Sequence, residues 1–213
     1  MENRIKTEYF DAKILTSKFF CRAKENSRYA ISGLFVEIDS NGLIRATSTD
    51  GHRLHQIEQN GFVDMGEAWF KENDHQAILP RFKLPAGIDR LAISWMKGSA
   101  LIQVSYGKIH KKYGKMDDLG SLTVHREIDR TFPPYRQVIP NYGRGDYLTI
   151  NRLSGFRADF LADAARFLGD FGLNAQLGQA KEGVQPMVLT GRIKDGDKPD
   201  CRGLAVIMPT SLE

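Results

Sequence analysis

The sequence is poor in the features that most often mark a secreted or membrane protein. It has two cysteines in 213 residues, Cys21 and Cys201, which fit neither a disulfide framework nor a zinc-binding pattern. Such cysteine usage is typical of a reducing cytosol, and we expect both side chains to be at least half-buried. The charged N-terminus is followed by no long apolar run, so we expect no signal peptide and no spanning helix. The sequence predicts a soluble, cytoplasmic protein that has no membrane partner.

Catalytic motifs are also missing. The sequence has no Gly-x-Ser-x-Gly elbow, no phosphate-binding glycine loop and no pair of carboxylates at metal-binding spacing. His52 and His55 are three residues apart on an expected strand and so point to opposite faces, and no cluster of acids or cysteines completes a metal shell around them. Cys21 has no evident histidine partner. These absences argue against an enzyme such as a nuclease, against a metal site and against a cofactor.

Charge of one sign is only slightly in excess. Thirty lysine and arginine residues against 26 aspartate and glutamate residues give a net charge of +4 and a pI of about 9.0. This excess fits a protein that works near nucleic acid but does not establish it. The densest basic run, residues 108–115, is flanked by glycines and is typical of a hairpin tip, which is either solvated or in contact with phosphate.

Hydrophobic residues, at 41% of the chain, are numerous enough for a real core, and their pattern predicts three successive helix-plus-strand units. The first unit begins with an amphipathic helix over 11–24, and Asn41-Gly42 marks a hairpin after it. In the second unit, Pro85 and Gly87 leave room for about one helical turn. Strands of these two units are expected at 29–38, 43–47, 53–58, 91–95, 101–106 and 121–126.

The third expected unit begins with a strand at 147–150. A helix over 151–168 follows, and Gly169 and Gly172 are positioned to end it. Further strands are expected at 175–179, 187–193 and 203–208.

Three separated segments carry the most specific signal. They are Ser48-Thr49-Asp50-Gly51-His52-Arg53-Leu54, residues 132–140 with three prolines, and residues 205–212 with the sequence Ala-Val-Ile-Met-Pro-Thr-Ser-Leu. Alone, the first is a tight turn in which Gly51 supplies an unusual φ, and the second is a linker. Together and in this order, they resemble the bacterial DNA polymerase III beta subunit, the sliding clamp.

The resemblance implies an α+β fold of the DNA-clamp type. In that fold, repeated helix-plus-antiparallel-strand units place the sheets outside and the helices on the inner face. Residues 1–141 resemble the middle domain of the beta subunit, and residues 146–213 resemble only the second half of its last domain. The first domain and the first half of the last domain have no counterpart in this sequence.

The resemblance also implies a hydrophobic pocket, where the three segments meet, for the peptide tails of polymerases and repair proteins. Carried over position by position, it comprises Ile31, Thr49, Gly51, His52, Arg53, Leu54, Pro133, Gln137, Val138, Val206, Met208, Pro209, Thr210 and Leu212. An apolar concavity with a polar rim suits leucine and phenylalanine anchors, and Met208 adapts to different partners. The family usually has a basic residue in place of Gln137, and a methionine and an arginine in place of Thr210 and Ser211. We therefore expect a different partner preference.

Duplex DNA is the second partner that the resemblance implies, held through phosphates and without sequence preference. The residues expected to face DNA are Lys13, Lys18, Arg22, Lys24, Arg81 and Lys83. A solvated helix face is the alternative for each of them, and the third-unit helix is close to neutral on its outer side.

The predicted function is that of a processivity factor. Copies of the chain would associate through exposed sheet edges into a ring around DNA, as a tetramer or a trimer, and hold a polymerase or another DNA-processing protein in the pocket. The alternative is a non-encircling binding module that uses the same pocket to sequester or redirect clamp-binding proteins.

Overall fold

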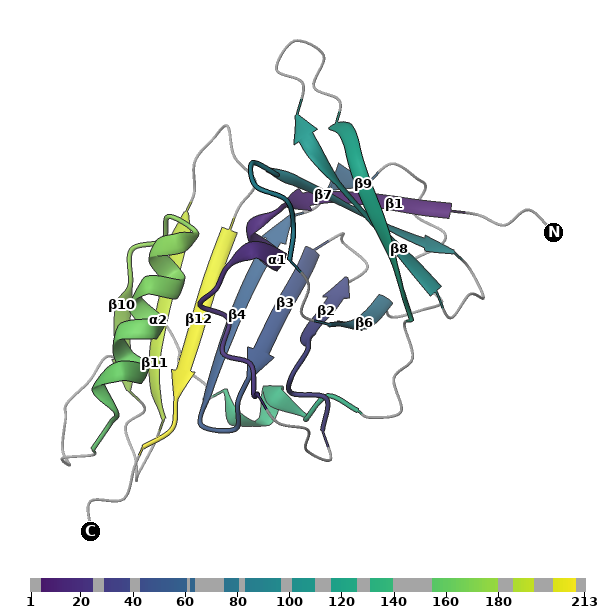
Figure 1. The fold of residues 1–213 in the computed structure, drawn as a ribbon. Helices are drawn as coiled ribbons and strands as arrows, with labels where there is room; N and C mark the ends of the chain where they lie inside the picture. The colour runs from purple at the N-terminus through teal and green to yellow at the C-terminus, as the bar shows by residue number, and fades with distance from the viewer. Residues whose placement is uncertain are drawn as a thin grey trace.

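Two antiparallel sheets and a few short helices make up the described part of the computed structural model (Figure 1). The structure describes residues 5–24, 29–38, 43–60, 62–63, 75–80, 83–96, 101–109, 116–125, 131–139, 155–179, 186–193 and 201–209. The five-stranded sheet has the order β5-β1-β7-β8-β9, and the seven-stranded sheet has the order β10-β11-β12-β4-β3-β2-β6.

The first two units interlock by exchanging their first strands. Strand β1 (Ile5–Asp11) does not join β2 (Leu34–Ile38), β3 (Leu43–Thr49) and β4 (Arg53–Asn60) of its own unit. It pairs instead with β7 (Arg90–Met96), beside β8 (Leu101–Ile109) and β9 (Met116–His125) of the second unit. In return, β6 (His75–Leu79) of the second unit pairs with β2. Each sheet therefore contains strands of both units. The short strand β5 (Phe62–Val63) covers the free side of β1.

The third unit extends the sheet of the first. Its strands are β10 (Gln176–Gln179), β11 (Met187–Ile193) and β12 (Cys201–Ile207), and β12 pairs antiparallel with β4 from Cys201↔Gln59 to Ile207↔Arg53. Helix α2 (Ala158–Asp170) lies across this part of the sheet (Figure 1). One continuous sheet thus crosses the expected division into residues 1–141 and 146–213, which remains a prediction.

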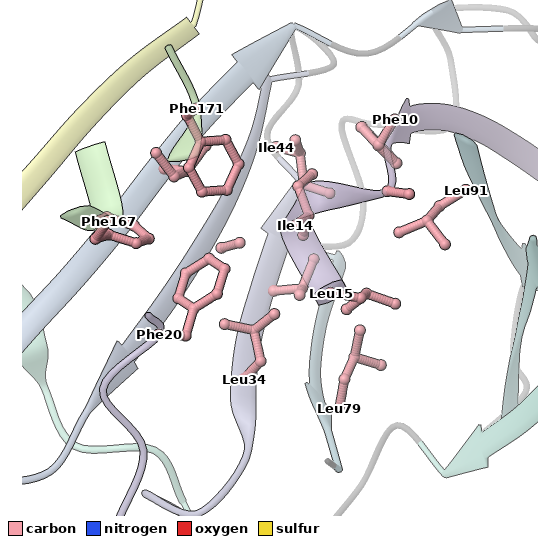
Figure 2. Packing of buried hydrophobic residues seen from close by; sticks show 14 of the residues in the cluster. Phe10, Ile14, Leu15, Phe20, Leu34, Ile44, Leu79, Leu91, Phe167 and Phe171 are labelled. Carbon is pink, nitrogen blue, oxygen red and sulfur yellow. The ribbon is translucent and has the colours of Figure 1, made fainter. Parts of the chain in front are cut away.

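The main hydrophobic core fills the space between the two sheets and beneath α2. In Figure 2, Phe20 lies beside Phe167 and Phe171, and its ring centroid is 5.0 Å from that of Phe167 and 6.2 Å from that of Phe171. Ile14 and Leu15 of α1 (Lys13–Thr16) are buried in the same cluster. The core thus joins all three units through large apolar side chains, the kind of burial that contributes most to stability.

The helix expected over 11–24 is wrong for most of its length. Strand β1 continues through Asp11, and α1 has only four residues. The segment after α1 leaves the helical path, so that Phe20 packs on Phe167 while the Cys21 thiol lies 3.3 Å from the Ser48 carbonyl oxygen. These contacts with distant residues override a local pattern that equally fits a helix.

The helix expected over 151–168 exists but is shifted along the chain. Arg157 has an extended backbone (ψ 121°) just before α2, and residues 147–154 lie outside the described part. The helix continues through Gly169 and ends because Gly172 adopts a positive φ of 72°. The Leu173 N–H then donates to the Leu168 carbonyl oxygen at 2.9 Å and the Gly172 N–H to the Gly169 carbonyl oxygen at 2.9 Å, as in a Schellman motif.

Most predicted strands are confirmed, while β1, β5 and β6 have no counterpart in the sequence prediction. The Asn41-Gly42 hairpin is supported by the antiparallel pairing of β2 with β3. In the basic run 108–115, Lys108 and Ile109 belong to β8 and pair with β9, and the rest of the run lies outside the described residues. Residues 83–89 in the second unit contain no helix. Neither α-helix in the described ranges is long and apolar enough to span a membrane.

Candidate partner-binding site

The three segments singled out in the sequence meet at one end of the seven-stranded sheet. Leu54 of β4 lies opposite Val206 of β12, and the Met208 backbone N–H donates to the His52 carbonyl oxygen at 2.9 Å. Residues 131–139 run across the face of the sheet opposite α2, where Tyr135 joins Leu54 and Val206 in a second apolar cluster. This cluster, which we call the outer cluster, consists of Leu54, Tyr135, Val188, Leu204 and Val206, with Phe35, Phe132 and Ile139 packed against it.

The outer cluster provides an apolar floor at this meeting point. Leu54 and Val206 are 2% and 1% exposed, so they are part of the fold as much as of any binding surface. The rings of Phe35 and Phe132 stack at 4.9 Å with an interplanar angle of 11° and attach residues 131–139 to β2. The floor is therefore formed before any partner arrives.

Exposed side chains surround this floor. Val138 and Met208 are 43% and 37% exposed, which is unusual for large apolar side chains in the described part of the chain. Gly51, His52 and Gln137 are exposed, and Pro133 and Pro209 are half-buried. The arrangement offers apolar contacts beside a polar rim, as a peptide with hydrophobic anchors requires.

Of the fourteen expected pocket residues, only Leu54 and Val206 belong to the outer cluster. Ile31 is half-buried and accepts a hydrogen bond from the Ala23 N–H at 3.1 Å, but it is not a member of that cluster. Thr210 and Leu212 lie outside the described residues. The assignment of all fourteen residues to a peptide pocket remains a prediction.

The turn before β4 is held by side chains of its own. The Asp50 Oδ1 atom accepts the N–H groups of His52 and Arg53, both at 3.1 Å, and the Thr49 hydroxyl donates to the Arg53 carbonyl oxygen at 2.7 Å. Gly51 has a φ of 92°, a region that side chains with a Cβ rarely adopt. The turn therefore presents Gly51 and His52 to solvent in a fixed conformation.

Arg53 joins this turn to α2 instead of forming part of an open rim. Its guanidinium group bonds Asp50 at 2.9 Å and Asp163 of α2 at 2.8 Å, and it lies 4.3 Å from the centroid of the Phe160 ring. Burial alone would lower the pKa of Arg53, but the hydrogen bonds to Asp163 and Asp50 outweigh it, so the net shift is upward. Arg53 is thus a charged link between the site and the third unit.

A buried carboxylate fastens residues 131–139 to the sheet. Glu37 of β2 is 6% exposed, and its Oε1 atom accepts hydrogen bonds from the Tyr135 hydroxyl and from Arg136 Nη2, both at 2.6 Å. Arg45 Nη1 lies 3.8 Å from the same oxygen. Sequence reasoning missed this anchor, although a glutamate within the apolar strand Leu-Phe-Val-Glu-Ile was a signal that it has a buried partner.

The buried reactive groups near the site do not form a catalytic arrangement. Burial, followed by the Asp50 charge, raises the pKa of the Cys21 thiol to about 12, which removes its nucleophilic character at neutral pH. His55 is enclosed between β4 and α2, where its ring stacks on Phe167 at 4.6 Å. No group of three or more potential metal ligands occurs in the described ranges.

The residues expected to face DNA lie mostly on irregular chain. Lys13, Lys18, Lys24 and Lys83 are exposed and Arg22 is half-buried, while Arg81 is outside the described residues. The outer side of α2 is close to neutral, because Arg157 pairs with Asp159 at 2.6 Å and Arg166 lies 3.6 Å from Asp163. The positions of these residues do not by themselves define a DNA-binding surface.

Comparisons with known proteins agree with this fold. No family model matches the chain. The beta sliding clamp of Pseudomonas putida is 28% identical over 149 residues, which cover 70% of this chain and 36% of the clamp. The structure of the DNA polymerase III subunit beta from Pseudomonas aeruginosa matches 96% of this chain and 66% of that chain, at 17% identity and a TM-score of 0.59. An H. pylori beta clamp matches 100% of this chain and 68% of that chain, at 13% identity and a TM-score of 0.59. In sequence and in fold, this chain is similar to bacterial beta sliding clamps, and its sequence match spans 36% of the length of the Pseudomonas putida clamp.

Proposed function

We propose that this protein is a non-catalytic tether that holds DNA-processing proteins by a short hydrophobic peptide. The observation that carries the proposal is the convergence of residues 48–54, 131–139 and 205–209 on one apolar floor with Met208 and Val138 exposed above it. A preformed floor with exposed apolar anchors favours binding, because little conformational entropy is lost when a partner arrives. Polymerases and repair proteins with clamp-binding peptides are the expected partners.

The proposal includes duplex DNA and self-association. Its relatives are named DNA polymerase sliding clamps, and a ring around DNA is the arrangement that lets such a protein slide without reading sequence. A single chain of 24.0 kDa is too small to surround a duplex by itself, so encircling requires several copies, as a tetramer or a trimer. A cytoplasmic location follows from the same proposal.

A second candidate function is a non-encircling module that sequesters or redirects clamp-binding proteins. The near-neutral outer side of α2 favours it, since Arg157 and Arg166 are already close to acidic partners. The shortness of α1 also favours the second function, because Lys18 and Lys24 lie outside it and do not line one face of a helix. Both functions use the same partner-binding site and differ in what the rest of the molecule does.

The partner-binding site is tested by replacing Met208 with alanine. We expect a fluorescent peptide with leucine and phenylalanine anchors to bind the Met208→Ala variant about tenfold more weakly or worse, because anchors in an apolar site dominate affinity. Fluorescence polarisation measures the dissociation constant. Leu119→Ala, which removes a 56% exposed side chain from β9, is the matched control and should bind like wild type. If Met208→Ala binds the peptide as tightly as Leu119→Ala does, the assignment of the partner-binding site is wrong.

Leu54 is a poor choice for the same test. Its side chain is 2% exposed and packed in the outer cluster, so Leu54→Ala is expected to cost about 2–5 kcal/mol of folding stability in addition to any effect on binding. Weaker peptide binding by Leu54→Ala would therefore not distinguish a lost contact with the peptide from a loss of folded protein.

A further inference from the structure

The turn that carries Val138 has little backbone attachment to the sheet beneath it. It is a single 3-10 turn, η2 (Tyr135–Val138), within residues 131–139 (Figure 1). Among the described residues, one backbone hydrogen bond joins 131–139 to another segment, from the Ala30 N–H to the Thr131 carbonyl oxygen at 3.2 Å. Side chains must therefore hold η2 in place.

Aromatic packing supplies part of this attachment. The Phe132 ring stacks on Phe35 at 4.9 Å, and the Tyr135 ring meets Phe35 edge-on at 6.0 Å. Burial of apolar surface is favourable but largely non-directional. These contacts keep the segment on the sheet without fixing how η2 is rotated there.

Glu37 supplies the contacts that have direction. Its Oε1 atom accepts hydrogen bonds from the Tyr135 hydroxyl and from Arg136 Nη2, both at 2.6 Å. Burial, followed by the hydrogen bond to Glu37, raises the pKa of Tyr135, so its hydroxyl remains a donor at neutral pH. Two bonds from adjacent residues to one oxygen fix the rotation of η2 on the sheet.

This rotation decides where Val138 points. In a 3-10 helix, residues three apart lie one above the other, so Val138 follows Tyr135 along the same side of η2. Tyr135 is 6% exposed and Val138 is 43% exposed, so the turn leads from a buried anchor to an apolar side chain in solvent. A rotation of η2 at Tyr135 would move Val138 and Gln137 with it.

Stability alone does not explain a carboxylate at position 37. A buried charge is costly unless it is paired, and a well-packed apolar side chain often stabilises a fold equally well. What Glu37 adds is one defined arrangement of its partners. Arg45 Nη1 lies 3.8 Å from the same oxygen and Arg45 Nε donates to Glu58 of β4 at 2.7 Å, so the arrangement extends to the strand that bears Leu54.

We propose that Glu37 is a positioning residue of the partner-binding site, which holds η2 in one orientation and so presents Gln137 and Val138 ready for the peptide. The identity of the ligand rests on the proposed function. Loss of Glu37 should reduce the fraction of molecules that are competent to bind and leave the bound contacts unchanged. The association rate constant then falls, whereas loss of a direct contact chiefly raises the dissociation rate constant.

Stopped-flow fluorescence with the labelled peptide tests this in Glu37→Leu. We expect the association rate constant to fall about fivefold or more, and the dissociation rate constant to stay within about twofold of wild type. An unchanged association rate constant, or a loss of affinity that lies wholly in dissociation, would overturn the proposal.

Glu58→Leu is the matched control. Glu37 and Glu58 both lie opposite Arg45 in the sheet, so the two variants remove a glutamate from the same face. No hydrogen bond or ion pair in the described ranges joins Glu58 to residues 131–139. Glu58→Leu should therefore bind the peptide with wild-type rate constants, and slower association in this control would contradict a specific role for Glu37.

Arg136→Met is a variant that spares the core, because the Arg136 side chain is 66% exposed. It should slow association when made alone and add little in the Glu37→Leu background, since both changes break the same link. Additive effects would mean that Arg136 contacts the peptide directly, and they would contradict the proposal.

Hydrogen exchange provides a readout that needs no peptide. In the unliganded protein, the amides of Tyr135 and Gln137 should exchange about tenfold faster in Glu37→Leu, while those of β12 keep their wild-type rates. Unchanged exchange at these two amides would overturn the positioning role even if the peptide binds at Met208. Faster exchange with no peptide binding by wild type would instead reject the proposed function and keep the role of Glu37 in fixing η2.

Discussion

At the scale of single residues, His55 is buried in a way that disfavours its charged form. Its ring nitrogen Nδ1 lies 2.7 Å from the Phe19 carbonyl oxygen, and its other nitrogen, Nε2, has no hydrogen-bond partner among the described residues. The ring is completely buried and stacks on Phe167. Burial lowers the pKa of His55 to about 4, and the hydrogen bond to Phe19 opposes this only in part. The neutral ring is therefore part of the folded structure.

This shift predicts a loss of stability in mild acid. The pKa of His55 is about 4 in the folded chain and 6.5 when unperturbed, so the unfolded chain takes up the proton first as pH falls. The full free energy of unfolding is therefore present above pH 6.5. Between pH 6.5 and pH 4 the protonation of His55 in the unfolded chain lowers that free energy by about 3 kcal/mol in all. Urea unfolding at several pH values measures it. His55→Gln should unfold more easily at pH 7 but show a flatter pH dependence, while the exposed control His52→Gln should follow wild type. Parallel pH profiles for His55→Gln and wild type would contradict the assignment.

At the scale of elements, the sequence predicts strands better than helices. Alternating apolar residues and the Asn41-Gly42 turn locate β2, β3 and β4, because both signals are local. The apolar spacing around Phe19 and Phe20 is equally local, and it fits a helix. The conformation that this segment adopts depends on the packing of Phe20 against Phe167 and Phe171, which are distant in the sequence. The exchange of β1 and β6 could not be predicted for the same reason. In the candidate site, the three motifs identify the segments, whereas Glu37 and Asp163 are found only from the structure.

The end of α2 contains two glycines whose replacement by alanine should change folding stability in opposite directions. Gly172→Ala should reduce stability by about 1 kcal/mol, since it places a Cβ at a positive φ of 72°. Gly169→Ala should raise stability by about 0.5–1 kcal/mol, because this glycine is inside the helix and an added Cβ would meet nothing within 4 Å. Urea midpoints compare the two variants. Shifts in the same direction would mean that the helix does not end at Gly172.

At the scale of the whole molecule, the two proposed functions differ in whether the protein is held on DNA. A closed ring is held by topology, whereas a basic patch is held by charge, and only the second is quickly disrupted by salt. The charges near α2 are largely compensated, so a purely electrostatic attachment should be weak. The net charge of +4 does not separate the two possibilities.

Retention on circular DNA makes this distinction. If the protein encircles DNA, protein assembled on a nicked plasmid should survive gel filtration in high salt and be released when a restriction enzyme linearises the plasmid. A loading factor from a clamp system should be tried alongside spontaneous assembly. Equal release from circular and linear DNA in both conditions would favour the non-encircling module.

The pairing of β4 with β12 has a consequence for when the protein becomes functional during synthesis. The two strands come from distant parts of the chain, and the hydrogen bond between Met208 and His52 continues their pairing. Until the ribosome has released β12, β4 has an open edge and the binding surface is incomplete. If the proposed site binds a partner peptide, a nascent chain acquires that ability only in the step that pairs β12 with β4.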